Sequence, residues 1–126
     1  MVGLVIVSHS QKLAESVVEL AALMAPEAPM AAAGGMEDGG FGTSFEKIYE
    51  AIESVYSDDG VIVLMDLGSA VMTTEMVIES MEDRLIKMVD CPIVEGAISA
   101  SVSAAGGDTI DNVVESAKMA CTMNKF

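Results

Sequence analysis

The sequence has few basic residues, few cysteines and no long apolar run, and each shortage excludes a class of protein. Its 126 residues include six lysines and arginines against twenty acids, which gives a formal net charge of −14. A chain this acidic repels nucleic acid, anionic lipid and free nucleotide, so we expect none of these as a partner. The charge favours basic partner surfaces, and it equally fits a plain role in solubility.

Apolar residues make up 52% of the chain, but polar residues interrupt them every few positions. No stretch approaches the roughly 18 apolar residues that a membrane-spanning helix needs. The apolar N-terminus has no basic residue before it, as a secretory signal would, so we expect a cytoplasmic protein without membrane contact. Cys91 and Cys121 have no second Cys or His at ligand spacing. We therefore expect no metal site and predict that both thiols lie in the core.

Hydrophobic periodicity predicts one α/β domain over residues 1–126. Continuous apolar runs are typical of strands covered on both faces, whereas apolar residues at helical spacing predict helices with one buried side. Such alternation favours a three-layer sandwich: a mainly parallel central sheet, with a strand order beginning 2-1-3, and helices on both faces. Strands are expected at residues 2–7, 30–33, 61–65 and 85–89, and helices at 11–24, 45–55, 70–81, 93–105 and from 110 onward.

Capping residues mark two of the expected helix starts. Ser10 is predicted to cap the first helix, and Thr43 with Glu46 three residues later has the pattern of a capping box for the second. The glycine-rich stretch at residues 34–43 cannot hold regular structure and predicts a long flexible loop.

Two of the predicted strands end at residues with complementary chemistry. His9, the single histidine, ends the first strand, and Asp66 ends the third. In a 2-1-3 sheet these ends lie side by side at the ligand-binding edge, because neighbouring strands are about 4.8 Å apart. A lone histidine is often only structural, but a carboxylate that fixes its tautomer frees the other nitrogen to attack. We predict that Asp66 accepts a hydrogen bond from His9 Nδ1 and that Nε2 is the nucleophile.

A phosphoryl group on His9 needs hydrogen-bond donors for its oxygens. Backbone N–H groups at helix N-termini bind anions, and two expected helix starts adjoin the predicted site. A hydroxyl from the glycine-rich loop is a further candidate, if that loop folds over His9. The residues predicted to bind phosphate are Ser10, Gln11, Thr43, Gly68 and Ser69.

Four sequence segments, which together span nearly the whole chain, resemble one family. They are GLVIVSHSQKLAESVVEL at 3–20, GGFGTS at 39–44, VIVLMDLGSAVMTTEM at 61–76 and CPIVEGAISASVSA at 91–104. In this order and spacing they resemble the phosphotransfer subunit of phosphoenolpyruvate-dependent dihydroxyacetone kinases. That family has the fold of mannose-type enzyme IIA domains.

The resemblance implies that the phosphocarrier HPr phosphorylates His9, that Asp66 orients the ring, and that the phosphoryl group passes to ADP on a nucleotide-binding kinase subunit. ADP, ATP and Mg²⁺ would stay on that partner, so we expect no cofactor in this chain, which has no P-loop. The resemblance also implies a homodimer. Some relatives carry further domains resembling HPr and enzyme I. The chain ends at Phe126 without them, so we expect it to depend on separate carriers.

Other functions would use the same residues. A sugar-transporting mannose-type enzyme IIA would also use His9 but deliver to an enzyme IIB. Those domains usually carry a bulkier segment, with two glycines and a final proline, where this chain has residues 67–70. A receiver-type signalling domain would be phosphorylated on Asp66, but it needs acids after the first strand to hold Mg²⁺, and a lysine after a late strand. This chain has neither. A binding domain without chemistry is the remaining alternative.

Overall fold

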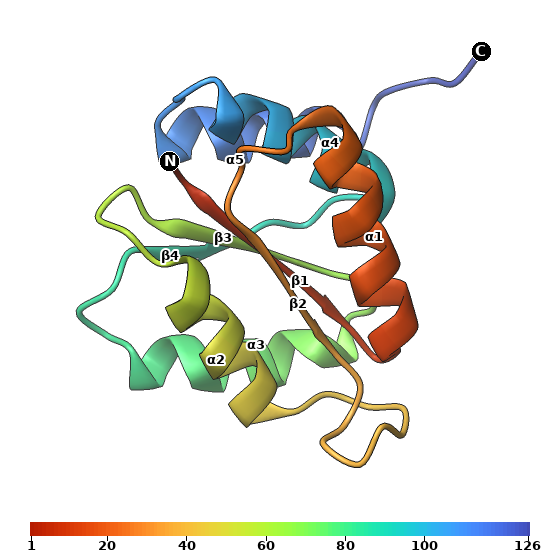
Figure 1. Cartoon of the computed structure of the whole chain (residues 1–126), viewed down its shortest axis with the longest axis vertical. Coiled ribbons are helices and arrows are strands. Elements are labelled where there is room, and N and C mark those ends of the chain that lie inside the picture. Colours follow the sequence, from red (N-terminus) through yellow and green to blue (C-terminus); the bar gives the residue numbers. More distant parts are fainter.

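The computed structural model describes residues 1–126 and is built around a parallel sheet of four strands in the order β2-β1-β3-β4. Five helices cover both faces of this sheet, which confirms the predicted α/β sandwich with an order beginning 2-1-3 (Figure 1). The strands are β1 (Gly3–Ser8), β2 (Met30–Gly34), β3 (Val61–Met65) and β4 (Ile86–Met88). The helices are α1 (Gln11–Met24), α2 (Phe45–Val55), α3 (Ser69–Ser80), α4 (Ile93–Ala105) and α5 (Ile110–Met119).

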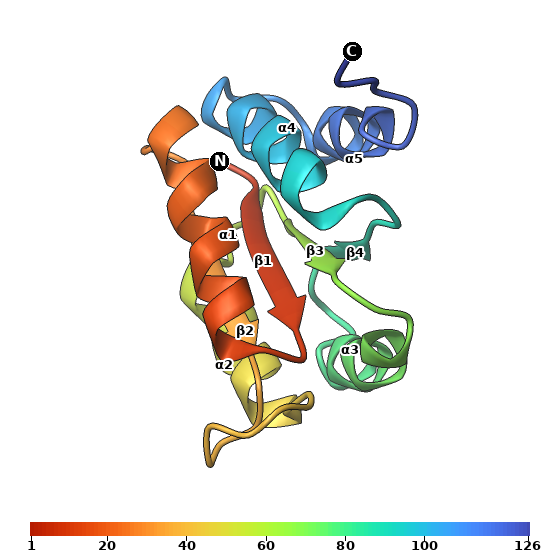
Figure 2. The same cartoon turned by 90° about the vertical axis from the view of Figure 1, so that its right-hand side faces the viewer.

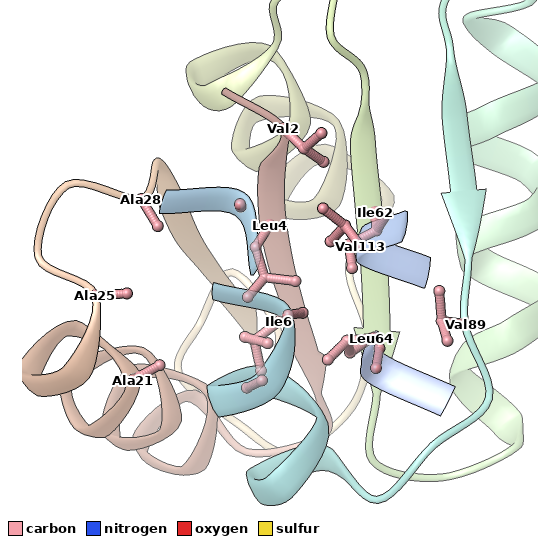
Figure 3. Packing of buried hydrophobic residues seen from close by; sticks show 14 of the residues in the cluster. Val2, Leu4, Ile6, Ala21, Ala25, Ala28, Ile62, Leu64, Val89 and Val113 are labelled. Atoms are coloured by element: carbon pink, nitrogen blue, oxygen red, sulfur yellow. The ribbon is translucent and has the colours of Figure 1, made fainter. Parts of the chain in front are cut away.

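Successive side chains of β1 alternate between two separate cores. Leu4 and Ile6 face α1 and α4, in the core that Figure 3 shows from close by. Val5 and Val7 lie in the other core, with side chains of α2 and α3. Helix α5 packs mainly on α4, beside which it lies in Figure 2. Every residue of β1 is buried, so its sequence from Gly3 to Val7 is apolar instead of alternating, and only the last residue, Ser8, is polar.

The two central strands end together. Val7 pairs with Met65, and the Asp66 N–H donates to the Val7 carbonyl oxygen at 3.1 Å. From β1 the chain enters α1 on one face of the sheet, whereas from β3 it enters α3 on the other. The residues that follow β1 and β3 therefore stand where the two crossovers diverge, which is the usual ligand site of an open parallel sheet.

Helix capping agrees with the sequence at α1 and differs at α2. Ser10 caps α1 as predicted. The capping box predicted from Thr43 and Glu46 is wrong, because α2 begins one residue later than that pattern requires. Ser44 is the N-cap instead, and its hydroxyl oxygen accepts the Lys47 N–H at 3.2 Å.

The two thiols lie in different environments. Cys91 is partly buried against the core. Burial raises its pKa to about 11, with smaller contributions from the negative charges of Cys121 and Asp90. The prediction of a core position for Cys121 is wrong, because α5 ends at Met119 and residue 121 lies exposed beyond it. No three His, Cys, Asp or Glu residues are grouped to hold a metal ion, and no helix is long and apolar enough to span a bilayer.

Gly34 ends β2 at a point where α1 passes very close. A Cβ at this position would lie 2.5 Å from the Ser10 carbonyl oxygen and 2.7 Å from Gln11 Cα. We expect Gly34→Ala to lower the free energy of unfolding by about 1–3 kcal/mol, because backbone atoms cannot yield as a flexible side chain would.

Chemical denaturation measures this loss. Gly106→Ala is the matched control, since an added Cβ there meets nothing closer than 3.4 Å and φ is an ordinary −74°. We expect the control to stay close to the wild-type stability. Equal stability of the two variants would contradict the close approach at Gly34.

Candidate functional site

The structure brings His9 and Asp66 together at the carboxyl edge of the sheet. His9 directly follows β1 and Asp66 directly follows β3, so residues 57 positions apart become neighbours. His9 Nδ1 lies 3.0 Å from Asp66 Oδ1. The His9 side chain is 26% exposed and that of Asp66 is 12% exposed. The contact is therefore largely shielded, while part of the ring remains open to a reactant.

Hydrogen bonds from three residues hold the Asp66 carboxylate. Oδ2 accepts the Ser8 hydroxyl at 2.8 Å and the His9 N–H at 3.1 Å. Oδ1 accepts the Leu67 N–H at 2.7 Å and faces the His9 ring. Burial raises the pKa of Asp66, but these hydrogen bonds together outweigh it and hold the pKa below its ordinary value. Asp66 is therefore an anion at neutral pH.

The charge of Asp66 determines which nitrogen of His9 is free. An ionised carboxylate only accepts hydrogen bonds, so the neutral ring carries its proton on Nδ1 and its lone pair on Nε2. Ser69 Oγ lies 2.6 Å from Nε2, and its hydroxyl donates to that lone pair. The free nitrogen thus has nucleophilic character and is already hydrogen-bonded to a side chain that can also bind an anion.

The residues predicted to bind phosphate do not all have free donors. Gly68 and Ser69 form the N-terminus of α3 beside His9 Nε2, where the first N–H groups of a helix lack intrahelical partners. Ser10 is engaged elsewhere, because its N–H donates to Ser8 Oγ at 3.0 Å and its hydroxyl caps α1. The Gln11 side chain donates along α1 to Glu15 at 2.9 Å, whereas the backbone N–H of Gln11, at the first position of α1, has no hydrogen-bond partner.

The glycine-rich loop lies against the site. Its Gly42 N–H donates to the His9 carbonyl oxygen at 2.9 Å. The Thr43 hydroxyl is 3.0 Å from the hydroxyl of Thr73 on α3. The loop therefore connects the end of β1 to α3, and the hydroxyl of Thr43 is engaged with α3.

Two features of the site were missed by the sequence reasoning. The first is Ser8, which is completely buried and hydrogen-bonded to Asp66. The sequence does carry a signal for it, since Ser8 is a polar residue at the end of an apolar strand, next to the candidate histidine. A groove of about 350 Å³ also opens beside Asp66, at the ends of β3 and β4. The groove is lined by Met65, Asp66, Leu67, Gly68, Val71, Met88, Val89, Asp90 and Cys91.

Known proteins share both this sequence and this fold. A family model, EIIA-man, described as the PTS system fructose IIA component, matches residues 3–114. The chain belongs to this family. The PTS-dependent dihydroxyacetone kinase, phosphotransferase subunit DhaM, of Lactococcus lactis subsp. lactis (strain IL1403) is 37% identical over 113 residues, and the match covers 90% of each chain.

A longer EIIA-man relative is the PEP-dependent dihydroxyacetone kinase, phosphoryl donor subunit DhaM, of Escherichia coli (strain K12). It is 44% identical over 121 residues, which make up 90% of this chain. The chain spans only 26% of the length of that relative. Both DhaM proteins confirm the resemblance to dihydroxyacetone kinase phosphotransfer subunits.

The EIIA-man fold also occurs in the crystal structure of the phosphotransferase system component EIIA from Streptococcus agalactiae. The two structures have a TM-score of 0.72, and the match covers 97% of this chain and 93% of the other. Their sequences are 17% identical, so this likeness concerns the fold alone.

Proposed function

We propose that this EIIA-man chain is a phosphohistidine carrier. His9 accepts a phosphoryl group from phosphorylated HPr and transfers it to ADP bound on the nucleotide-binding subunit of dihydroxyacetone kinase. The observation that carries the proposal is the orientation of His9, whose Nδ1 contacts Asp66 while Nε2 faces Ser69 at the start of α3. The names of the two DhaM relatives support the kinase as the destination.

Acceptance begins with attack of the Nε2 lone pair on the phosphorus of the donor phosphohistidine. A P–N bond to His9 forms as the donor P–N bond breaks, and the electron pair of the broken bond returns to the donor ring. The His9 ring gains positive charge, which the Asp66 carboxylate stabilises through Nδ1–H without removing the proton. The Ser69 hydroxyl then donates to an oxygen of the phosphoryl group instead of to Nε2.

Delivery to ADP reverses these bond changes. A terminal phosphate oxygen of ADP attacks the phosphorus, the P–Nε2 bond breaks, and its electron pair returns to Nε2. The neutral ring with its proton on Nδ1 is restored. In this scheme nucleotide and Mg²⁺ stay on the partner subunit, so the carrier needs no cofactor. A net charge of −14 on the carrier supports this division, because it disfavours binding of free nucleotide.

The proposal extends to the oligomeric state and the cellular location of the carrier. We expect the EIIA-man domain to form a homodimer that acts in the cytoplasm. Delivery to an enzyme IIB of a sugar transporter is the alternative that uses the same His9 chemistry. A receiver-type role for Asp66 has less support, because both of its carboxylate oxygens are occupied by donors from Ser8, His9 and Leu67.

A reconstituted transfer assay tests the acceptor. The protein is phosphorylated with phosphoenolpyruvate, enzyme I and HPr, freed of these components, and mixed with the ADP-loaded nucleotide-binding kinase subunit or with a mannose-type enzyme IIB. We expect ATP to form with the kinase subunit and negligible label to reach enzyme IIB. Transfer to enzyme IIB without ATP formation would replace the proposed function with the sugar-transport alternative.

A further inference from the structure

Ser8 is a buried polar residue at the end of an apolar strand. Its side chain has no exposure to solvent, and its neighbours in β1 are apolar. Such a hydroxyl is costly to bury unless both its donor and its acceptor capacity are used. In this structure both are used, because Ser8 Oγ lies 3.0 Å from the Ser10 N–H donor and 2.8 Å from Asp66 Oδ2.

Each hydrogen bond of Ser8 has only one possible direction. A backbone N–H can only donate, so Ser8 Oγ accepts the hydrogen of Ser10. The single hydroxyl hydrogen of Ser8 is then left for Asp66 Oδ2, which also accepts the His9 N–H at 3.1 Å. With two donors directed at it, Oδ2 can take up a proton only if one of these hydrogen bonds breaks. The direction of the network therefore favours the charged carboxylate.

The network also fixes the rotation of the carboxylate. With Oδ2 bound by Ser8 and the His9 N–H, Oδ1 is the oxygen that faces His9 Nδ1. We propose that Ser8 is a positioning residue that holds the Asp66 carboxylate in the orientation that keeps the proton of His9 on Nδ1. This inference rests on the proposed role of His9 as the phosphorylated residue.

Ser8 differs from two of the other donors to Asp66 because its hydrogen bond comes from a side chain. Two of those donors, at His9 and Leu67, are backbone N–H groups that no side-chain substitution removes. Burial acts to raise the pKa of Asp66, and among the hydrogen bonds that lower it that of Ser8 contributes most. Ser8 is thus the one residue, apart from His9 itself, whose side chain can be changed to alter the carboxylate.

The test measures the tautomer of His9 in the unphosphorylated protein. His9 is the single histidine, so its ¹⁵N ring signals are unambiguous. In Ser8→Ala we expect part of the population to move its proton from Nδ1 to Nε2. We also expect the kcat for phosphoryl acceptance to fall roughly 10- to 100-fold, the size of effect seen for carboxylates and other groups that orient metal-bound histidines, with little change in the KM for phosphorylated HPr.

Conservative variants separate positioning from packing. Ser8→Thr keeps the hydroxyl and should retain the wild-type tautomer and rate. In Ser8→Cys the side chain has a similar shape but is only a weak donor. We therefore expect this variant to shift the tautomer and the rate in the same direction as Ser8→Ala. The cysteine and threonine variants decide the question even if Ser8→Ala does not fold.

Ser103→Ala is the matched control. Ser103 is also buried, at 8% exposure, and its hydroxyl also donates to a carboxylate, that of Asp108 at 2.6 Å. Its loss should lower stability without changing the His9 signals or the rate. Wild-type ¹⁵N signals and rates in folded Ser8→Cys, and in Ser8→Ala where it folds, would overturn the proposal. Failure of phosphoryl transfer by the wild-type protein would instead count against the proposed function, and the tautomer measurement would still be interpretable.

Discussion

The His9→Gln variant is expected to lose phosphoryl acceptance, with the rate falling by more than about 10⁴-fold to the background of the assay. Glutamine retains polarity and a similar reach, but its amide nitrogen has no lone pair available for attack. No second histidine exists in the chain to replace His9. Transfer of radiolabelled phosphate from phosphorylated HPr measures the loss, and an unchanged unfolding temperature shows that the variant is folded.

The stability of the attached phosphate gives an independent readout of the same prediction. On the wild-type protein it should be labile in acid and stable in base, as a phosphohistidine is. A phosphate with the opposite stability, retained in His9→Gln, would move the modification to a carboxylate such as Asp66. That result would favour the receiver-type function over the carrier.

Asp66→Asn should reduce the rate of phosphoryl acceptance by about 10³- to 10⁴-fold, the size of effect seen when a histidine base takes the wrong tautomer. The amide has one oxygen and one NH₂ group, whereas the wild-type site directs donors at both carboxylate oxygens. An NH₂ group at the position of Oδ1 would donate to His9 Nδ1 and shift the ring proton to Nε2. The nucleophilic lone pair would then be lost.

Asp90→Asn is the matched control for this substitution. Asp90 lines the groove beside Asp66, and the change removes the same charge at the end of the neighbouring strand. We expect nearly wild-type rates from it. Equal losses in the two variants would show that general negative charge at this edge, not contact with His9, supports the reaction.

Asp66→Asn should also change how the stability of the fold depends on pH. The pKa of Asp66 is lower in the folded protein than in the unfolded chain, so its charge stabilises the fold above the unfolded pKa. This contribution is lost as the pH falls through the folded pKa. Asp66→Asn should therefore be less stable than the wild type near neutral pH, with the difference shrinking in acid. Urea denaturation at a series of pH values measures it.

The sequence predicted the sheet and the central pair well for a physical reason. Both β1 and β3 are buried on two faces and are therefore continuously apolar, so the polar residues that end them stand out. The parallel order then brings His9 and Asp66 to one edge. Only short-range periodicity and one topological rule were needed for this prediction.

The finer polar contacts depend on geometry that periodicity does not contain. Ser10 resembles a free anion donor in the sequence, but the turn after β1 directs its N–H at Ser8. Thr43 has the spacing of a helix cap, yet the loop delivers its hydroxyl to Thr73. Cys121 continues the apolar spacing of α5 beyond the point where that helix ends. In each case the local path of the chain decides the partner of the side chain or N–H group, and the spacing of residue types does not contain that path.

The register of β1 and β3 has a consequence for how the chain tolerates insertions. Val7 pairs with Met65 at the edge that carries the site, whereas the turn at Gly60 contacts Gly3 at the opposite edge. Added residues in that remote turn leave the spacing of His9 and Asp66 unchanged. A single residue inserted directly after Val7 would instead reverse the alternation of the strand end and turn His9 away from its partner. Reporter tags and loop grafts therefore belong in the turn at Gly60, where a change in the length of the chain does not move His9 or Asp66.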